Sequence, residues 1–368
     1  MTTTPRSPVT IRDVAQAAGV STASVSSVIN GRSRVSAQTT ARILETIATL
    51  GYQINPTARN LRAGRTNAIG LVVPELNRPY FAQLSTLLAD LIDRSGRHLV
   101  VQRSGGDREK ELAAASFARF RMYDGVIISV VGLDPDDLKN LNFTTPVVLI
   151  GERPLHHTFD HVIMDNVGGA HQATTHLIER GARRIALLGG ALPDQPASDM
   201  ALFRTQGYAD AHADVSLIPD PGLIIPLDSF GAEAGRAAVH DLVDRGIEFD
   251  AVFAVTDVVA MGAMRALADL GISIPDQVQV IGFDNVTESE FSIPSLTSID
   301  PNKQAIATQV LELLDSRLNQ AGSPTGDVTD GITGGVAGGV PVRGSQNPAP
   351  PREITIPTTL VARESTLP

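Results

Sequence analysis

Small hydroxyl side chains are concentrated in the segment STASVSS at residues 21–27. Serine and threonine hydroxyls donate and accept hydrogen bonds, and side chains this short allow close approach to base edges in a major groove. Val25, Val28 and Ile29 recur at the spacing of one helix face, which leaves the hydroxyls on the other faces. The segment predicts a DNA-contacting helix, and the alternative is a plain helical bundle with a Ser/Thr-rich surface.

The charge distribution favours a nucleic-acid partner for the same region. Residues 1–65 contain eight arginines and two acidic residues, a net charge of +6. The whole chain carries −10, so residues 66–368 carry −16. A basic segment joined to an acidic remainder is typical of a polyanion-binding module on a separate domain.

Motifs for catalysis or metal binding are not found in the sequence, which contains no GxGxxG, GxSxG or HExxH. It has no cysteine either, which excludes disulfides and thiolate metal sites. We therefore predict no enzyme activity, no cofactor and no metal site, in a cytoplasmic protein without a membrane span. We expect most of the clustered histidines to be solvated, namely His156, His157, His161, His171 and His176.

Three short helices are expected to position the hydroxyl segment, because each has a capping residue before it and a glycine after it. A tight glycine-containing turn between the first two helices is typical of a helix-turn-helix. The N-caps are Thr10 (in a capping box with Asp13), Ser21 and Ser36, and the helices end at Gly19, Asn30-Gly31 and Gly51.

Apolar runs and amphipathic stretches alternate from residue 67 onward, which predicts parallel sheets covered by helices on both faces. Two such sets indicate two similar lobes with a ligand cleft outside their strand ends. The strands are expected in AIGLVV, RHLVVQ, GVIISVV, PVVLI, RRIALLGG, LIIPL, DAVFAV, VQVIGF and REITIPTTLVARES. Helices are expected to begin near Pro79, Asp107, Pro135, Asn166, Asp199, Gly231 and Asp257.

The run from Val9 to Thr66 resembles the headpiece of the lactose/galactose repressor (LacI/GalR) family. It contains the pattern DVA..AGVS..SVS.V.NG, the GY.pN that precedes the family's hinge, and the A..L of the hinge itself. The resemblance continues at lower identity to the end of the chain. It implies an all-α helix-turn-helix headpiece at 1–54, a hinge helix at 55–65, and an α/β two-lobed, doubly wound, periplasmic-binding-protein-like domain at 66–368.

The same resemblance implies that Thr22, Ala23 and Ser27 lie where the family reads bases. Ser27 departs from the family, which commonly has arginine there, so the operator sequence is not transferable. Asn55 and Pro56 suit a helix start, and the resemblance implies that Leu61 wedges into the minor groove. The candidate DNA contacts are Thr10, Ser21, Thr22, Ala23, Ser26, Ser27, Asn30, Arg34, Asn55, Ala58, Arg59, Leu61 and Arg62.

For the remainder, the resemblance implies a first lobe at 66–163 and 299–321 and a second lobe at 164–298 and 352–368. The Gly/Pro-rich segment 322–351 is expected to form a flexible loop. The chain would cross between the lobes near Met164, near Ile299 and at the start of the last strand.

The resemblance also places candidate effector contacts. Arg204, in RTQGY, matches an arginine that bonds ligand hydroxyl or carboxylate groups, and Phe230 falls where an aromatic ring stacks on a sugar. Asp257 could instead chiefly cap its helix, Arg78 and Arg103 could be exposed, and one of Tyr80 and Phe81 could be core. The set is Asn77, Arg78, Tyr80, Phe81, Arg103, Arg204, Phe230, Thr256, Asp257 and Asp284.

These features predict a repressor that binds double-stranded operator DNA as a homodimer under the control of a small effector. A sugar is favoured as the effector, and a purine, a nucleoside or a protein partner is the alternative. These alternatives stay open because Pro301 stands where the family usually has a ligand-contacting side chain. A sugar-binding protein without DNA binding is the rival function, but it has no use for residues 1–65.

Overall fold

The computed structural model describes residues 9–29, 35–52, 66–119, 122–140, 145–152, 159–193, 195, 197–322 and 349–367. The chain divides into two units, Met1–Thr66 and Asn67–Pro368, which we call the headpiece and the body. None of the described helices is long and apolar enough to span a membrane.

The headpiece contains the three predicted helices, α1 (Ile11–Ala18), α2 (Thr22–Ile29) and α3 (Ala37–Leu50). The Ser21 hydroxyl caps α2 by accepting a hydrogen bond from the Ser24 amide at 3.1 Å. Gly19 follows α1 with φ at 64°, a left-handed conformation that glycine adopts without strain, and this residue turns the chain between α1 and α2. The core is small: in the part of the headpiece that the structure describes, its buried residues are Val14, Ala15, Ala18, Val25 and Ile43.

The body contains two six-stranded sheets, one in each lobe. The first runs in the order β11-β5-β4-β3-β1-β2 with every pair parallel, and the second runs β12-β10-β9-β8-β6-β7 with only β12 antiparallel. The strands of the first sheet are β1 (Ala68–Val73), β2 (His98–Arg103), β3 (Gly125–Ser129), β4 (Val147–Gly151), β5 (Asp160–Met164) and β11 (Glu353–Ile356). Those of the second are β6 (Ile185–Leu188), β7 (Ile224–Ile225), β8 (Ala251–Ala254), β9 (Gln279–Phe283), β10 (Thr297–Asp300) and β12 (Thr359–Val361).

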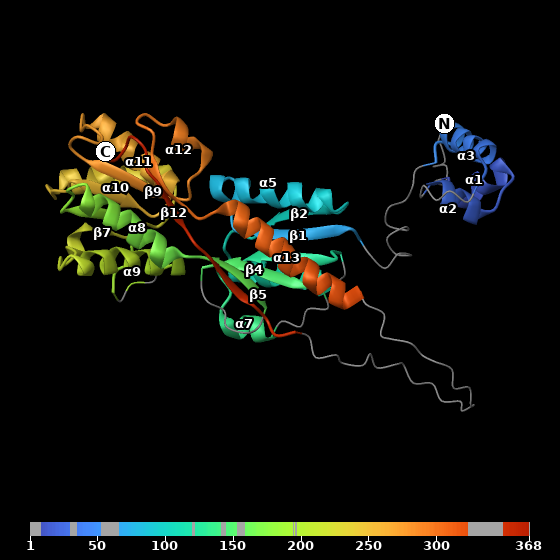
Figure 1. Ribbon diagram of the computed structural model, residues 1–368, viewed down its shortest axis with the longest axis horizontal. Helices are drawn as coiled ribbons and strands as arrows, with labels where there is room; N and C mark the ends of the chain where they lie inside the picture. Colours follow the sequence, from blue (N-terminus) through green and yellow to red (C-terminus); the bar gives the residue numbers. More distant parts are fainter. Residues whose placement is uncertain are drawn as a thin grey trace, which may run out of the picture. The chain divides into compact units, whose positions relative to one another are not determined.

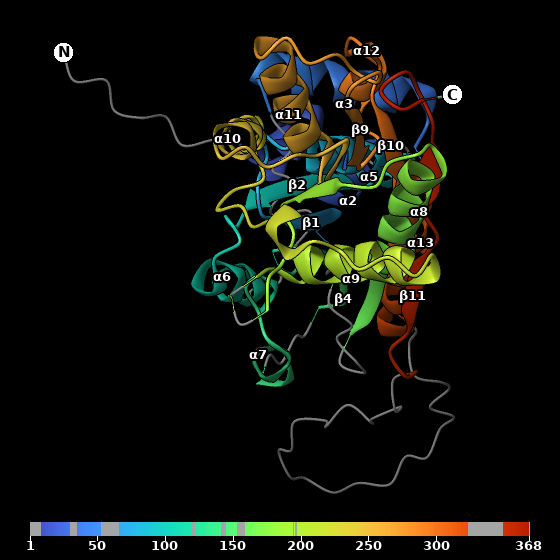
Figure 2. The same cartoon turned by 90° about the vertical axis from the view of Figure 1, so that its left-hand side faces the viewer.

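Helices pack on both faces of each sheet, and the central strands are therefore buried on both sides, as their continuous apolar sequences predict. Figure 1 shows the two lobes of the body, and Figure 2 shows α8 beside α9 in the second lobe. The first lobe carries α5 (Pro79–Arg94), α6 (Arg108–Arg119), α7 (Pro135–Asn140) and α13 (Lys303–Gly322). The second carries α8 (Asn166–Glu179), α9 (Asp199–Asp214), the short η1 (Pro221–Leu223), α10 (Ala232–Asp244), α11 (Asp257–Asp269) and α12 (Thr287–Phe291).

The chain passes between the lobes between β5 and α8, between β10 and α13, and between β11 and β12. The prediction that the whole final strand lies in the second lobe was wrong. Residues 353–356 pair with β5 in the first lobe, and only 359–361 reach the second, as the red segment in Figure 1 shows. Pro357 separates the two pieces, because proline has no amide hydrogen to donate to a strand partner.

The histidines differ from the expectation of solvation. His161 lies on the buried strand β5 with 1% of its surface exposed, and burial lowers its pKa to about 4. His176 is also buried, on α8, whereas His171 is partly exposed and contacts Asp214 at 2.7 Å. His156 and His157 lie outside the described residues.

Candidate functional site

The surface of α2 carries the candidate base contacts. Ser21, Thr22 and Ala23 are exposed at its start, while Ser26 and Ser27 are partly buried further along. Val25 is completely buried, so the helix is held against α1 and α3 from its opposite side. The exposed face therefore consists of hydroxyl and methyl groups, which can enter a major groove without long side chains to reorganise.

Thr10 is exposed at the start of α1, as a contact to a DNA phosphate requires. Its amide and hydroxyl both donate to the Asp13 carboxylate, at 2.7 and 2.8 Å, and these bonds lower the pKa of Asp13. The other candidate DNA contacts lie outside the described residues, namely Asn30, Arg34, Asn55, Ala58, Arg59, Leu61 and Arg62.

Arg204 is the most buried cation of the predicted effector set, with 1% of its surface exposed on α9. Its guanidinium donates to the Asn166 side-chain oxygen at 2.9 Å and to the Val255 carbonyl. It lies 3.5 Å from the centre of the Phe283 ring and 3.9 Å from the Asp284 carboxylate. Because these partners come from the start of α8 and from the carboxyl ends of β8 and β9, Arg204 ties three segments of the second lobe together.

Arg204 interacts electrostatically with groups from both lobes: Asp284 belongs to its own lobe, whereas Tyr80 and Glu152, which follows β4, belong to the first lobe. We call these four residues the interlobe cluster. Burial raises the pKa of Tyr80 and of Glu152, and it raises the pKa of Asp284 to about 7 against the opposing charge of Arg204. The Tyr80 hydroxyl and the Asn166 side-chain nitrogen are buried, and neither has a hydrogen-bond partner among the described residues. Such groups are costly to bury, so a ligand that bonds them would be favoured.

Asp284 occupies a special backbone position directly after β9. Its φ is 111°, outside the range that residues other than glycine usually adopt, and its backbone oxygen accepts a hydrogen bond from the Lys303 ammonium. Strained positions of this kind are concentrated at functional sites, where surrounding contacts enforce them.

Thr256 and Asp257 make their hydrogen bonds within the second lobe. The Thr256 hydroxyl caps α11 by accepting from the Val259 amide at 3.2 Å. The Asp257 carboxylate accepts from the Ser289 hydroxyl at 2.7 Å and the Ser298 hydroxyl at 2.5 Å. Asp257 thus ties three segments together, and Thr256, not Asp257, provides the side-chain cap.

The remaining predicted contacts come from the first lobe. The Arg78 guanidinium lies 5.8 Å from the ring of Phe230 in the second lobe. Tyr80 is the buried member of its pair, and Phe81 packs edge-on against it with 5.1 Å between ring centres. Asn77 is exposed, and Arg103 is committed to a two-point ion pair with Glu75 at 2.7 and 2.8 Å.

Three contributors to this site were missed by the sequence prediction, namely Asn166, Glu152 and Met164. Met164 ends β5, and its sulfur accepts from the Arg204 guanidinium at 3.5 Å. Asn166 begins α8 two residues later, and Glu152 directly follows β4. Each lies at a carboxyl end of a strand, which is the signal that could have identified them. Among the described residues, no cluster of three or more potential metal ligands is present.

Comparison with known proteins identifies both parts of the chain. Residues 10–55 match the lacI family of bacterial regulatory proteins, and residues 174–336 match a periplasmic binding protein-like domain. The HTH-type transcriptional repressor PurR of Histophilus somni is 31% identical over 316 residues, which cover 85% of this chain and 93% of that protein.

Two solved structures are similar over almost the full length. The lac repressor bound to ONPG is 26% identical with a TM-score of 0.78, covering 98% of this chain and 100% of that one. A complex of the transcriptional regulator CelR with cellobiose is 28% identical with a TM-score of 0.64, covering 97% and 99%.

Proposed function

The chain belongs to the LacI family of bacterial regulatory proteins, and from this premise we propose that it is a transcriptional repressor. Its headpiece binds operator DNA, and a small ligand held between the lobes of the body controls the affinity of that binding. The relative PurR, which shares 31% of its residues with this chain, is itself named a transcriptional repressor. The repressor acts in the cytoplasm on chromosomal DNA and leaves its ligand chemically unchanged.

The exposed face of α2 is the observation that carries the DNA-binding role. Thr22 and Ala23 present a hydroxyl and a methyl group on a helix anchored by Val25. In a helix-turn-helix, the first residues of the second helix contact base edges in the major groove. Two copies of the chain bind the two halves of a pseudo-palindromic operator.

A matched pair of variants tests this role. Thr22→Ala removes the exposed hydroxyl of α2, whereas Thr49→Ala removes an exposed hydroxyl from α3. We expect Thr22→Ala to weaken binding to a duplex selected from a random library by about tenfold, the cost of one base contact, and Thr49→Ala to leave it unchanged. Equal losses of affinity for the duplex in the two variants would show that α2 does not contact the bases.

The interlobe cluster is the proposed effector site, and a sugar or sugar derivative is the proposed effector. Within the cluster, Arg204 supplies a planar donor group and Asp284 an acceptor. Phe230, which lies opposite Arg78 outside the cluster, supplies an aromatic face. Together these groups suit hydroxyl groups and the apolar face of a sugar ring. The similar regulator CelR was solved with cellobiose, which supports a sugar over a purine. Calorimetry against sugars and nucleosides separates the two classes.

Contacts between the lobes provide the route from ligand to operator. The Gln83 side chain of α5 donates to the Thr287 hydroxyl of α12 at 3.2 Å, and Arg78 approaches Phe230. A ligand between the lobes changes how closely these elements approach each other. It therefore changes the position of the first lobe, which follows the headpiece in the chain. The hinge residues 55–65 lie outside the described part of the chain, and their ordering on DNA is part of the proposal.

A further inference from the structure

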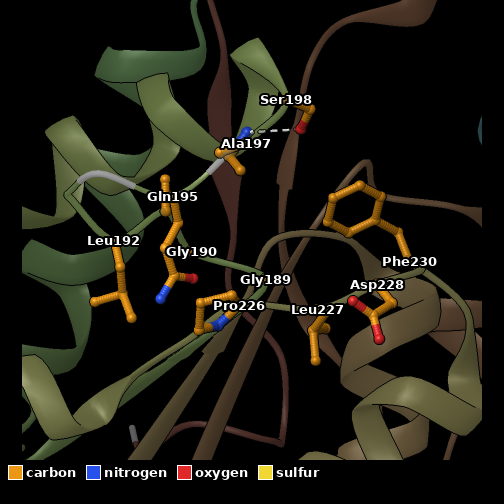
Figure 3. A pocket seen from close by; sticks show the side chains of 12 residues that line it. Gly189, Gly190, Leu192, Gln195, Ala197, Ser198, Pro226, Leu227, Asp228 and Phe230 are labelled. Atoms are coloured by element: carbon orange, nitrogen blue, oxygen red, sulfur yellow. Dashed lines mark hydrogen bonds between the residues drawn. The ribbon is translucent and has the colours of Figure 1, made fainter.

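The last helix of the first lobe, α13, begins directly after the chain has crossed from β10 in the second lobe. Part of the proposed effector site lies on that second lobe, including Asp284 and the cavity whose wall is formed by Phe230 and Asp228 (Figure 3). The headpiece, in contrast, is followed in the chain by the first lobe, which starts at Asn67. An effector therefore needs a link across the lobes if it is to influence DNA binding.

Lys303, the first residue of α13, holds a backbone turn of the second lobe. Its ammonium donates to the Asp284 carbonyl and, at 3.0 Å, to the Asn285 carbonyl. The φ angles of these two residues are 111° and 44°, values that are uncommon outside glycine and that persist only where surrounding contacts enforce them. Because Asp284 belongs to the interlobe cluster, a side chain of the first lobe helps to position an acidic group of the proposed effector site.

The middle of α13 is seated on the first sheet. Ile306, Val310 and Leu314 are buried in the core of the body, and Figure 1 shows the helix lying along the first lobe. A Cβ at Gly125 of β3 would come within 2.8 Å of the Leu314 side chain, so glycine allows this close approach. Close-packed contacts of this kind transmit displacement, so a shift at the start of α13 moves the first lobe with it.

The other end of α13 is anchored where the first lobe begins. The Asp315 carboxylate pairs with the Arg97 guanidinium at 2.6 Å, and the Arg97 side chain is mostly buried. The next residue, His98, donates its amide to the Asn67 carbonyl at 2.8 Å. A helix rises about 1.5 Å per residue, so Lys303 and Asp315 lie about 18 Å apart along its axis. The helix thus joins the turn at Asp284 to the residue that follows the headpiece.

We propose that α13 couples the effector site to the headpiece, and that Lys303 is the positioning residue on which this coupling depends. An effector that bonds the Asp284 side chain shifts the turn, Lys303 transfers the shift to α13, and α13 moves the segment that starts at Asn67. Lys303 acts through Asp284 and not by contact with the effector. This inference rests on the proposed control of DNA binding by a ligand between the lobes, and it names the contacts through which that control passes.

Binding measurements with the full chain test this role. The probes are a duplex selected from a random library and a panel of cellobiose, maltose, lactose, glucose, galactose and ribose. In the unaltered chain, a saturating amount of the tightest-binding sugar should change duplex affinity at least about fivefold. Lys303→Met, which removes the donors but keeps a long side chain, should reduce this change to less than about twofold. Lys303→Arg should restore it, because arginine can still donate to both carbonyls.

The reciprocal measurement separates coupling from a merely structural role. Coupling between two sites is symmetric, so the effect of the duplex on sugar affinity should fall in Lys303→Met by the same factor. A structural defect would weaken each affinity but leave the coupling unchanged, and thermal unfolding shows whether the body remains folded. Lys110→Met, at an exposed position on α6, is the matched control and should change neither affinity nor coupling.

Asp315→Ala tests the far end of the helix without touching the effector site. It removes the ion pair with Arg97, so it should reduce the effect of the sugar on duplex affinity by about half or more while sugar affinity stays within about twofold. Glu312→Ala is the control, because Glu312 is exposed and bonds only within α13, to Gln309. Equal results for these two variants would overturn the role of the Arg97 anchor.

Unchanged coupling in Lys303→Met would overturn the inference while leaving a ligand-controlled repressor in place. If no sugar of the panel alters duplex binding, hydrogen exchange supplies the readout. The duplex should then change exchange of the Asn285 amide, which donates to the Ser298 hydroxyl, in the unaltered chain but not in Lys303→Met. An equal change in both chains would overturn the inference, whereas a chain that selects no duplex would overturn the proposed function together with it.

Discussion

The headpiece and the body hold the side chains of their proposed sites in opposite ways. On α2, Thr22 and Ala23 are exposed over a core of five buried residues. In the body, Arg204 and Asp284 are buried and hold each other through several strand ends. Contacts to DNA bases need side chains that are already exposed. A ligand site needs polar groups that bind the ligand strongly, and burial strengthens their interactions because the local dielectric constant is low. The two sites should therefore fail independently when each is damaged.

The largest effect is expected from Arg204→Gln. The substitution leaves the buried carboxyl group of Asp284 and the half-buried one of Glu152 without their cation, which should lower the free energy of unfolding of the body by about 3–5 kcal/mol. Effector binding should be lost, whereas the headpiece should keep its affinity for DNA. Denaturant unfolding and DNA binding on the same sample measure both. If the variant lost DNA binding while its body remained folded, the two sites would not be independent.

Val25→Ala makes the reciprocal change in the headpiece. Val25 is completely buried in a very small core, so its truncation should cost about 2 kcal/mol, enough to unfold much of the headpiece. Specific DNA binding should fall more than tenfold, while effector affinity and thermal unfolding of the body stay unchanged. Calorimetry with the effector provides the check, and a shift in effector affinity would contradict the comparison.

Asp284 should give the body a pH dependence that the headpiece lacks. Burial raises the pKa of Asp284 to about 7, so the folded body holds this proton to a higher pH than the unfolded chain does. The stability that Asp284 contributes is complete below about pH 4 and is lost as the pH rises through about 7.

Thermal unfolding of the body between pH 5 and pH 8 measures this contribution. The difference in melting temperature between the unaltered chain and Asp284→Asn should fall by about 2 °C or more as the pH rises from 5 to 8. Asp276→Asn, at an exposed position, is the control and should show a constant difference from the unaltered chain. A constant difference for Asp284→Asn as well would mean that this carboxyl group ionises normally.

The smallest effect is expected from Gln83→Ala at the contact between the lobes. Its hydrogen bond to Thr287 at 3.2 Å is exposed, and an exposed neutral bond contributes about 0.5–1.5 kcal/mol at most. Effector affinity should change by less than about tenfold, and the affinity of the unliganded chain for DNA should not change. A larger change would mean that this contact controls the arrangement of the lobes.

The sequence predicted the headpiece well because its signals are local. Ser21 and Ser36 cap the helices they were expected to cap, and Gly19 takes the left-handed conformation after α1. Helix starts in the body were also predicted to within one residue, for example at Pro79 and Asn166. Capping and periodicity depend on neighbours in the chain, so they can be read without knowing the tertiary structure.

The interlobe cluster was predicted only in part because it is assembled from distant segments. Arg204, Tyr80 and Asp284 were expected and do come together, but Asn166 and Glu152 were missed. Asp257 was expected to face the ligand or cap its helix, whereas it accepts hydrogen bonds from α12, from its N-cap residue and from β10, which approach it only in the folded lobe. The strand order that separates β11 from β12 likewise depends on pairing that periodicity does not encode.

The most direct test of the account is binding of the full chain to DNA with and without sugar. A duplex selected from a random library and an unselected duplex of the same length are titrated at physiological salt, alone and with the tightest-binding sugar of the panel. We predict that the selected duplex binds about 10³-fold or more tightly, and that the sugar changes this ratio at least about fivefold. Equal affinity for both duplexes, whether or not sugar is present, would contradict a ligand-controlled reader of sequence.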